Sequence, residues 1–401
     1  MRKFFIVAWL AFSSLAFAST EDALNSLVNN MQQAILEQHK STYLELVDLT
    51  DPVFALEHSR WVEDWVNHPV KQLELGFVLL GESVNSATGT LTWKYLNRDG
   101  LRIVASYPVV FHQLEHRWLY AGELWLELKA LNVIVKYAPG LEDQAKSVLE
   151  RLPEITAHVA SSLEFQSQAM TNVKIYASRE GLTQSVGMSW KVFDGWNELG
   201  EAIKVSSGGI SSTVLAHEIT HNYAFEHFGS SSFPWWLDEG LAEYVSSKYW
   251  SPYQLELNRR RVADWAKAGE LQPWENLTIL DETPTALWKF VYAQGFAFVR
   301  FLTDTYGQKS RNHWLLEISS GKSLSEAAQI TFGKSFEELN QDFRLWLEAA
   351  GNLSYFSNFG TSLLQRISPL PTAHCTITTA SPCLSGMLKT SPMLGLPPQT
   401  L

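Results

Sequence analysis

The residues best suited to chemistry form a short run of histidine and glutamate. His217, Glu218 and His221 stand in the sequence H-E-I-T-H, with the two histidines four positions apart. In a helix, residues four apart lie on one face, so both imidazoles can reach a single metal ion. Glu218 is rotated by about 100° from His217, which is too far round to bind the same metal but suits a proton acceptor beside it. The spacing predicts a zinc site with Glu218 as its general base.

Two downstream residues compete for the place of a third metal ligand. His227 would extend the motif to H-E-x-x-H-x-x-A-x-x-H, with Ala224 where a glycine would let the chain turn back to the metal. With alanine there, we expect the helix to continue and to carry His227 off the ligand face. Glu239 and Glu243 lie four positions apart in the segment W-L-D-E-G-L-A-E-Y, residues 236–244. We therefore predict Glu239 as the third ligand, and Glu243 as the partner of the second ring nitrogen of a ligand histidine.

The segment around Glu239 is predicted to form a second helix. Pro234 suits the first turn of such a helix, and Ser231 or Ser232 is its candidate cap. Gly240 would destabilise the interior of this helix by about 1 kcal/mol relative to alanine. A glycine at this position therefore predicts a close approach to another helix.

Together the two segments resemble the gluzincin zinc peptidases, and especially the bacterial peptidase MA-like group. They are also similar to the membrane alanyl aminopeptidases, whose second segment reads N-E-G-F-A. The resemblance covers roughly residues 130–349. It implies an α+β, thermolysin-like catalytic domain with a small sheet and C-terminal helices. It also implies that Zn²⁺ is held by His217, His221 and Glu239, and that the substrate is a peptide or protein.

A third segment, Y-A-Q-G-F-A-F at residues 292–298, resembles the Y-E-K-G-F-A segment of the aminopeptidases. The tyrosine of that segment stabilises the oxyanion, so the resemblance implies this role for Tyr292. The alternative is that Tyr292 only packs in an apolar helix, and His313 or Tyr249 would then be the next residues to test. The aminopeptidase G-x-M-E-N segment, which grips a free amine, is not matched by G-W-N-E-L at residues 195–199. The resemblance thus implies a metallopeptidase without supporting an aminopeptidase.

This site predicts a hydrolytic mechanism. Three protein ligands leave zinc one position for water, and zinc lowers the pKa of that water to about 7. Glu218 would take the proton and deliver it to the leaving amine. The alternative is a non-catalytic exported binding or scaffold protein on a zinc-stabilised peptidase fold. A purely structural site needs no base, so the intact Glu218 favours catalysis.

The first residues of the chain predict export. Residues 1–18 have the pattern of a secretory signal peptide: Arg2 and Lys3, an apolar run, and A-F-A at 16–18 as the cleavage site. No later apolar run is long enough to span a bilayer, so we expect a secreted or periplasmic protein without an integral membrane segment. Loss of the two basic residues would take the formal net charge from −11 to −13. Such an acidic chain is a poor partner for nucleic acid or an anionic membrane, which both require a basic face.

Residues 19–125 follow the predicted signal peptide and precede the peptidase-like region. Their pattern predicts a small α+β accessory domain of two helices and a β-meander. Apolar residues at helical spacing predict the first helix: Leu24, Leu27, Val28, Met31 and Ile35. A second helix is expected from Pro52, around Trp61 and Trp65. Strand-like runs follow near 72–80, 89–96, 101–113 and 117–124.

Residues 126–349 form the predicted peptidase MA-like domain. Strand-like runs at 132–137 and 172–177 flank a helical pattern over 141–163, and 201–205 forms a strand just before H-E-I-T-H. In gluzincins this last strand is the sheet edge on which extended substrate pairs, and the resemblance implies the same for 201–205.

The end of the chain, residues 350–401, is predicted to be a disordered tail. Residues 352–401 hold six of the fifteen prolines and no Asp, Glu or Trp. Cys375 and Cys383 lie in this tail, and in an exported protein they are candidates for a small disulfide loop.

Overall fold

The structure is a computed structural model, which describes residues 19–229 and 233–352. The predicted signal peptide and the pair Cys375 and Cys383 lie outside these residues. The chain divides into two compact units, each described by itself below. The first unit extends to Leu126 and includes Ala138–Gly140 and Thr183–Val192, and the second holds the rest. Within the described residues, no helix combines the length and apolar character needed to cross a membrane.

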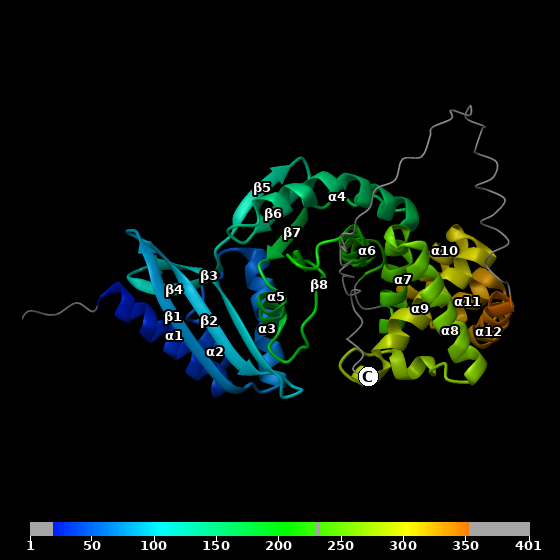
Figure 1. Ribbon diagram of the computed structural model, residues 1–401, viewed down its shortest axis with the longest axis horizontal. Helices are drawn as coiled ribbons and strands as arrows, with labels where there is room; N and C mark the ends of the chain where they lie inside the picture. Colours follow the sequence, from blue (N-terminus) through cyan, green and yellow to red (C-terminus); the bar gives the residue numbers. More distant parts are fainter. Residues whose placement is uncertain (1–18, 230–232, 353–401) are drawn as a thin grey trace, which may run out of the picture. The chain divides into compact units, whose positions relative to one another are not determined.

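The first unit is an antiparallel β-meander with three helices before it (Figure 1). Its helices are α1 (Thr20–Leu36), α2 (Lys40–Leu44) and α3 (Pro52–Asn67). Its strands pair in chain order: β1 (Lys71–Glu82), β2 (Ser86–Leu96), β3 (Arg102–Leu114) and β4 (Arg117–Glu123). The two predicted helices and all four predicted strands are confirmed. The five-residue α2 was not predicted, because so short a helix carries no periodic pattern.

Alternation along the strands builds the core of this unit. Every second residue of β2 is buried, and this face meets α3, where the rings of Trp61 and Trp93 lie 5.7 Å apart. The distant segment Thr183–Val192 is fastened to the same helix. The indole N–H of Trp61 donates to the carbonyl of Gln184 at 2.7 Å, and the amide of Ser189 donates to Asp64 at 3.0 Å.

The second unit contains a five-stranded mixed sheet. Its strands are β5 (Leu126–Ala130), β6 (Val133–Tyr137), β7 (Thr171–Tyr176), β8 (Gly195–Trp196) and β9 (Ile203–Ser206), in the order β5-β6-β7-β9-β8. β6, β7 and β9 are parallel, whereas β8 pairs antiparallel with β9. The prediction that 201–205 forms the sheet edge is wrong, because β8 pairs on its outer side. A two-residue strand has no alternation by which the sequence could have revealed it.

Helices make up the remainder of the second unit. They are α4 (Glu142–Leu163), α5 (Arg179–Val186), α6 (Ser212–Phe228), α7 (Trp235–Ser246), α8 (Pro252–Ala268), α9 (Trp288–Tyr306), α10 (Gln308–Ser319), α11 (Leu324–Phe332) and α12 (Phe336–Asn352), with α5 continuing into the first unit. α6 packs against β9 and α4, and α7 packs between α6 and α9 (Figure 1). The predicted α+β class, with a small sheet followed by C-terminal helices, is confirmed.

Candidate metal centre

The H-E-I-T-H motif lies on α6. The Ser211 hydroxyl caps this helix by accepting from the amide of Val214 at 3.1 Å. The helix continues without a break to Phe228, as the alanine at 224 predicted. His217 and His221 therefore share one face, and their Nε2 atoms lie 3.2 Å apart.

The second segment lies on α7, which begins at Trp235 with Pro234 as its N-cap residue and no side-chain cap. The two serines predicted as caps of this helix, Ser231 and Ser232, lie outside the described residues. The predicted close approach at Gly240 is confirmed. A Cβ on Gly240 would lie 2.5 Å from the carbonyl carbon of Gly295 in α9, so only glycine allows the two backbones to meet.

Three side chains converge on one point. His217, His221 and Glu239 each offer a donor atom, and these atoms lie within 4.8 Å of one another. Glu239 Oε2 is 3.1 Å from Nε2 of His217 and 3.6 Å from Nε2 of His221. Tetrahedral zinc with bonds of 2.0–2.1 Å separates its ligand atoms by about 3.3–3.4 Å. The described geometry therefore fits a zinc ion held by two imidazoles and a carboxylate.

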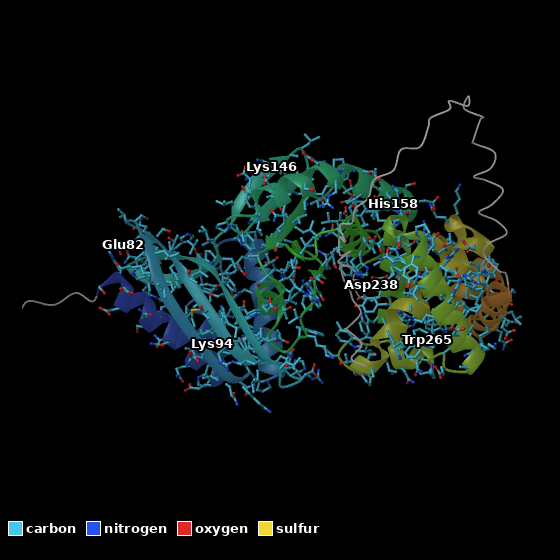
Figure 2. All side chains as sticks on the ribbon, in the orientation of Figure 1. Glu82, Lys94, Lys146, His158, Asp238 and Trp265 are labelled. Atoms are coloured by element: carbon cyan, nitrogen blue, oxygen red, sulfur yellow. The ribbon has the colours of Figure 1, made fainter. Side chains whose placement is uncertain are left out.

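Further side chains on α7 orient these three groups. Glu243 Oε1 lies 3.3 Å from Nδ1 of His217, where the sequence predicted it. Oδ1 of Asp238 lies 3.2 Å from Nδ1 of His221 (Asp238 is labelled in Figure 2). The indole N–H of Trp235 donates to the other oxygen of Glu239 at 2.9 Å. The negative charge of a carboxylate near each Nδ1 favours a proton on that nitrogen, so Nε2 is the nitrogen left to bind a metal.

The electrostatics follow from burial and close pairing. Burial opposes the charge of His217, but hydrogen bonds to Glu239 and Glu243 outweigh it and raise the pKa of His217 to about 10. The pKa of His221 is also raised: burial opposes this, and Asp238 and Glu239 outweigh it. Burial opposes the charge of Glu239 as well, but its two histidine partners hold the pKa of its carboxyl below the usual range. Without metal, the two histidines are therefore protonated, and a metal cation must displace these protons in order to bind.

Glu218 stands apart from the three ligands. It is buried on α6, and burial raises the pKa of its carboxyl to about 7. Its Oε1 lies against the backbone of Gly195 in β8, so closely that a Cβ there would overlap the carboxylate. β8 therefore runs beside the predicted base, and a Cβ at position 195 would require the Glu218 side chain to shift.

Tyr292 is brought to the centre by the contact of α7 with α9. It precedes Gly295 by three residues, and Gly295 packs on Gly240, the neighbour of Glu239. The Tyr292 ring lies 6.4 Å from the ring of His217. Burial, then the negative charge of Glu239, raises the pKa of Tyr292 well above its ordinary value. Its hydroxyl therefore keeps its proton and can act as a donor.

The remaining candidates lie elsewhere. His227 stacks on Phe165 with ring centroids 4.4 Å apart, away from the three ligands. Tyr249 packs edge-on against His158, and His313 lies 3.3 Å from Glu317 on α10.

The sequence missed three residues of this centre. Trp235 precedes Glu239 by four positions, so helical spacing alone could have found it. Asp238 faces His221 from another helix, and no local spacing signals such a contact. In the sequence, Gly195 was compared only with the amine-binding motif, which this segment does not match. Its contact with Glu218 depends on the pairing of β8 with β9, which the sequence does not show.

Comparisons with known proteins give a distant structural likeness. No family model matches the chain, and no curated protein matches it. An M1 zinc metallopeptidase from Deinococcus radiodurans matches at 14% identity with a TM-score of 0.39, over 70% of this chain and 61% of that one. A mutant of the M1 enzyme from the same organism matches at 15% identity with a TM-score of 0.40, over 70% of this chain and 62% of that one. A two-domain M1 zinc metallopeptidase mutant bound to L-arginine matches at 15% identity with a TM-score of 0.35, over 69% of this chain and 61% of that one. The chain thus spans about three fifths of the length of these structures.

Proposed function

We propose that this protein is a zinc-dependent peptidase, with Glu218 as general base and His217, His221 and Glu239 as metal ligands. The observation that carries the proposal is the convergence of the three donor atoms at separations of 3.1, 3.2 and 3.6 Å. We further propose that it acts after export, on the strength of the predicted signal at residues 1–18.

Catalysis, rather than metal binding alone, is favoured by the surroundings of the ligands. A structural zinc site is closed by four protein ligands, whereas a catalytic one has three. The described residues supply three, and the adjacent carboxylate of Glu218 is not among them. A buried carboxylate that binds no metal has a use in proton transfer and none in holding an ion.

Each residue then has a defined task in peptide hydrolysis. Zinc, when bound, supplies Lewis acidity that polarises the scissile carbonyl and acidifies a water molecule. The Glu218 carboxylate accepts a proton from the attacking water and returns it to the leaving amine nitrogen, so the C–N bond breaks to give an acid and an amine. The protonated hydroxyl of Tyr292 donates to the carbonyl oxygen as negative charge develops there.

The substrate strand is best placed along β8. Among the described residues this strand ends the sheet, and an extended peptide can add to a sheet at its end strand. Gly195 also brings β8 against Glu218. Two residues later, Asn197 is only 8% exposed, and among the described residues neither its amide nitrogen nor its amide oxygen has a hydrogen-bond partner. A substrate main chain offers both groups that this amide lacks.

The proposal is tested with the mature chain, residues 19–401. We expect about one zinc per molecule by metal analysis and cleavage of an unstructured peptide library that stops when zinc is removed by a chelator. Zinc binding without cleavage of any peptide would favour the non-catalytic binding protein. Absence of zinc would reject the site itself.

A further inference from the structure

A second candidate site lies in the first unit, in a pocket of about 330 Å³. It forms where α3 passes into β1, beside the turn from β2 to β3. Met188 and Ser189 of the distant segment Thr183–Val192 also line it. Its volume falls at the lower end of the range of small-molecule sites, roughly 300–1,000 Å³. The peptidase chemistry proposed above makes no use of this pocket.

The walls of this pocket are fixed in place by hydrogen bonds. The Asn97 amide donates to the carbonyl of Trp190 at 3.2 Å and accepts from the amide of Leu101 at 2.8 Å. The amide of Arg98 donates to the carbonyl of Ser189 at 3.3 Å. Ser189 is held in turn by Asp64, through its backbone amide at 3.0 Å and through its hydroxyl. The β2–β3 turn, α3 and the distant segment are thus bound together, so the pocket is formed before any ligand arrives.

The lining combines an apolar surface with positive charge. Pro69, Val70, Leu96 and Met188 supply the apolar part. Lys71 and Arg98 supply two cationic groups, and neither forms an ion pair within the described residues.

Hydrogen-bonding groups add to this charge. His68 also lines the pocket, with a buried Nδ1 that has no hydrogen-bond partner among the described residues and lies 3.6 Å from Asp64 Oδ1. The lining includes no carboxylate. Asp64 is not part of the lining, and its oxygens accept hydrogen bonds from Ser189. Asp99, at the same turn, lies 3.6 Å from Lys191.

We propose that this pocket binds a small organic carboxylate with an apolar body. Arg98 and Lys71 both line the pocket and would engage the carboxylate, since both cations match its charge and a guanidinium also matches its paired oxygens. The apolar part of the ligand would cover Val70 and Leu96, which are partly exposed. A neutral ligand would leave both cations unused, so charge is the feature that selects the ligand.

The test uses N-acetyl-leucine and its neutral analogue N-acetyl-leucinamide as probes, with the mature full chain and saturation-transfer NMR. We expect the acid to bind in the millimolar range, as ligands of this size do, and the amide to bind at least about tenfold more weakly. Equal binding of the two probes, or binding of neither, would overturn the proposal.

Two variants locate the binding. Arg98→Gln should weaken binding of the acid by about tenfold or more. Arg102→Gln is the matched control, because Arg102 is an exposed arginine at the start of β3 that does not line the pocket. Equal losses in the two variants would mean that general charge, rather than the pocket, attracts the acid.

A chelator separates this pocket from the metal centre. Binding of the acid should persist after zinc removal, because no metal ligand lines the pocket. Loss of binding with the metal would place the acid on zinc and would refute the proposal, whereas the peptidase assignment would be untouched by either result.

Discussion

Replacing Gly240 with alanine is expected to damage the metal centre through the packing of two helices. The added Cβ would lie 2.5 Å from the carbonyl carbon of Gly295 and 2.7 Å from its oxygen. Ordinary van der Waals contact begins at 3.4 Å, so α7 must move away from α9 by about 0.9 Å. Glu239 is the residue before Gly240 and moves with it. Metal–ligand distances tolerate only about 0.2 Å, so the shift would remove Glu239 from its bonding position.

The sign of the change in unfolding free energy caused by Gly240→Ala distinguishes a packing effect from a helix-propensity effect. Alanine in place of a mid-helix glycine would ordinarily stabilise by about 1 kcal/mol. Overpacking costs about 1–3 kcal/mol, which leaves a net destabilisation of about 0–2 kcal/mol. For a unit of this size we expect the melting temperature to fall by up to about 8 °C.

Zinc affinity by competition with a chelator, and melting temperature by calorimetry, measure both effects. Gly76→Ala is the control, because a Cβ at Gly76 in β1 meets nothing within 4 Å. We expect Gly240→Ala to lose at least about tenfold in zinc affinity and the control to change neither quantity. A Gly240→Ala protein with unchanged affinity and an equal or higher melting temperature would refute the packing argument.

Further predictions concern individual residues of the centre. Glu239→Ala should lose more zinc affinity than the roughly 10–100-fold typical of losing an outer partner, whereas His227→Ala should lose none; metal analysis showing the reverse would make His227 the ligand. Tyr292→Phe should lower kcat by about 10²–10³-fold with zinc content unchanged, and an unaltered kcat would leave the tyrosine only a packing role. Because the pKa of His217 is raised to about 10 in the metal-free protein, zinc must displace protons, so its affinity should rise about tenfold or more per pH unit from 6 to 8. An affinity that is flat across this range would contradict the protonated state of the free site.

What the sequence could predict is local. Helical spacing placed His217 and His221 on one face, because side chains four apart must meet whatever surrounds the helix. The alanine at 224 likewise predicted a continuous helix and the separation of His227 from the centre. Gly240 predicted close helix packing, since a glycine inside a helix is destabilising unless a neighbour requires it.

What the sequence could not predict depends on pairing between distant segments. The order β7-β9-β8 places a two-residue strand at the edge of the described sheet. So short a strand has no alternation of apolar and polar residues by which it could be predicted. Asp238 reaches His221 only because α6 and α7 cross at the motif. The attachment of Thr183–Val192 to the first unit rests on the burial of Met188 in that unit's core and on hydrogen bonds such as that from Trp61 to Gln184, which leave no pattern in composition.

The most direct test of the central claim compares wild type with Glu218→Gln at equal zinc content, using a peptide that the wild type cleaves. Glutamine keeps the shape of the side chain beside Gly195 but cannot take a proton from water. We predict that the variant keeps its zinc and its melting temperature and loses about 10²–10⁴-fold in kcat. Near-normal cleavage by the zinc-loaded variant would contradict the proposal that Glu218 is the base of a zinc peptidase.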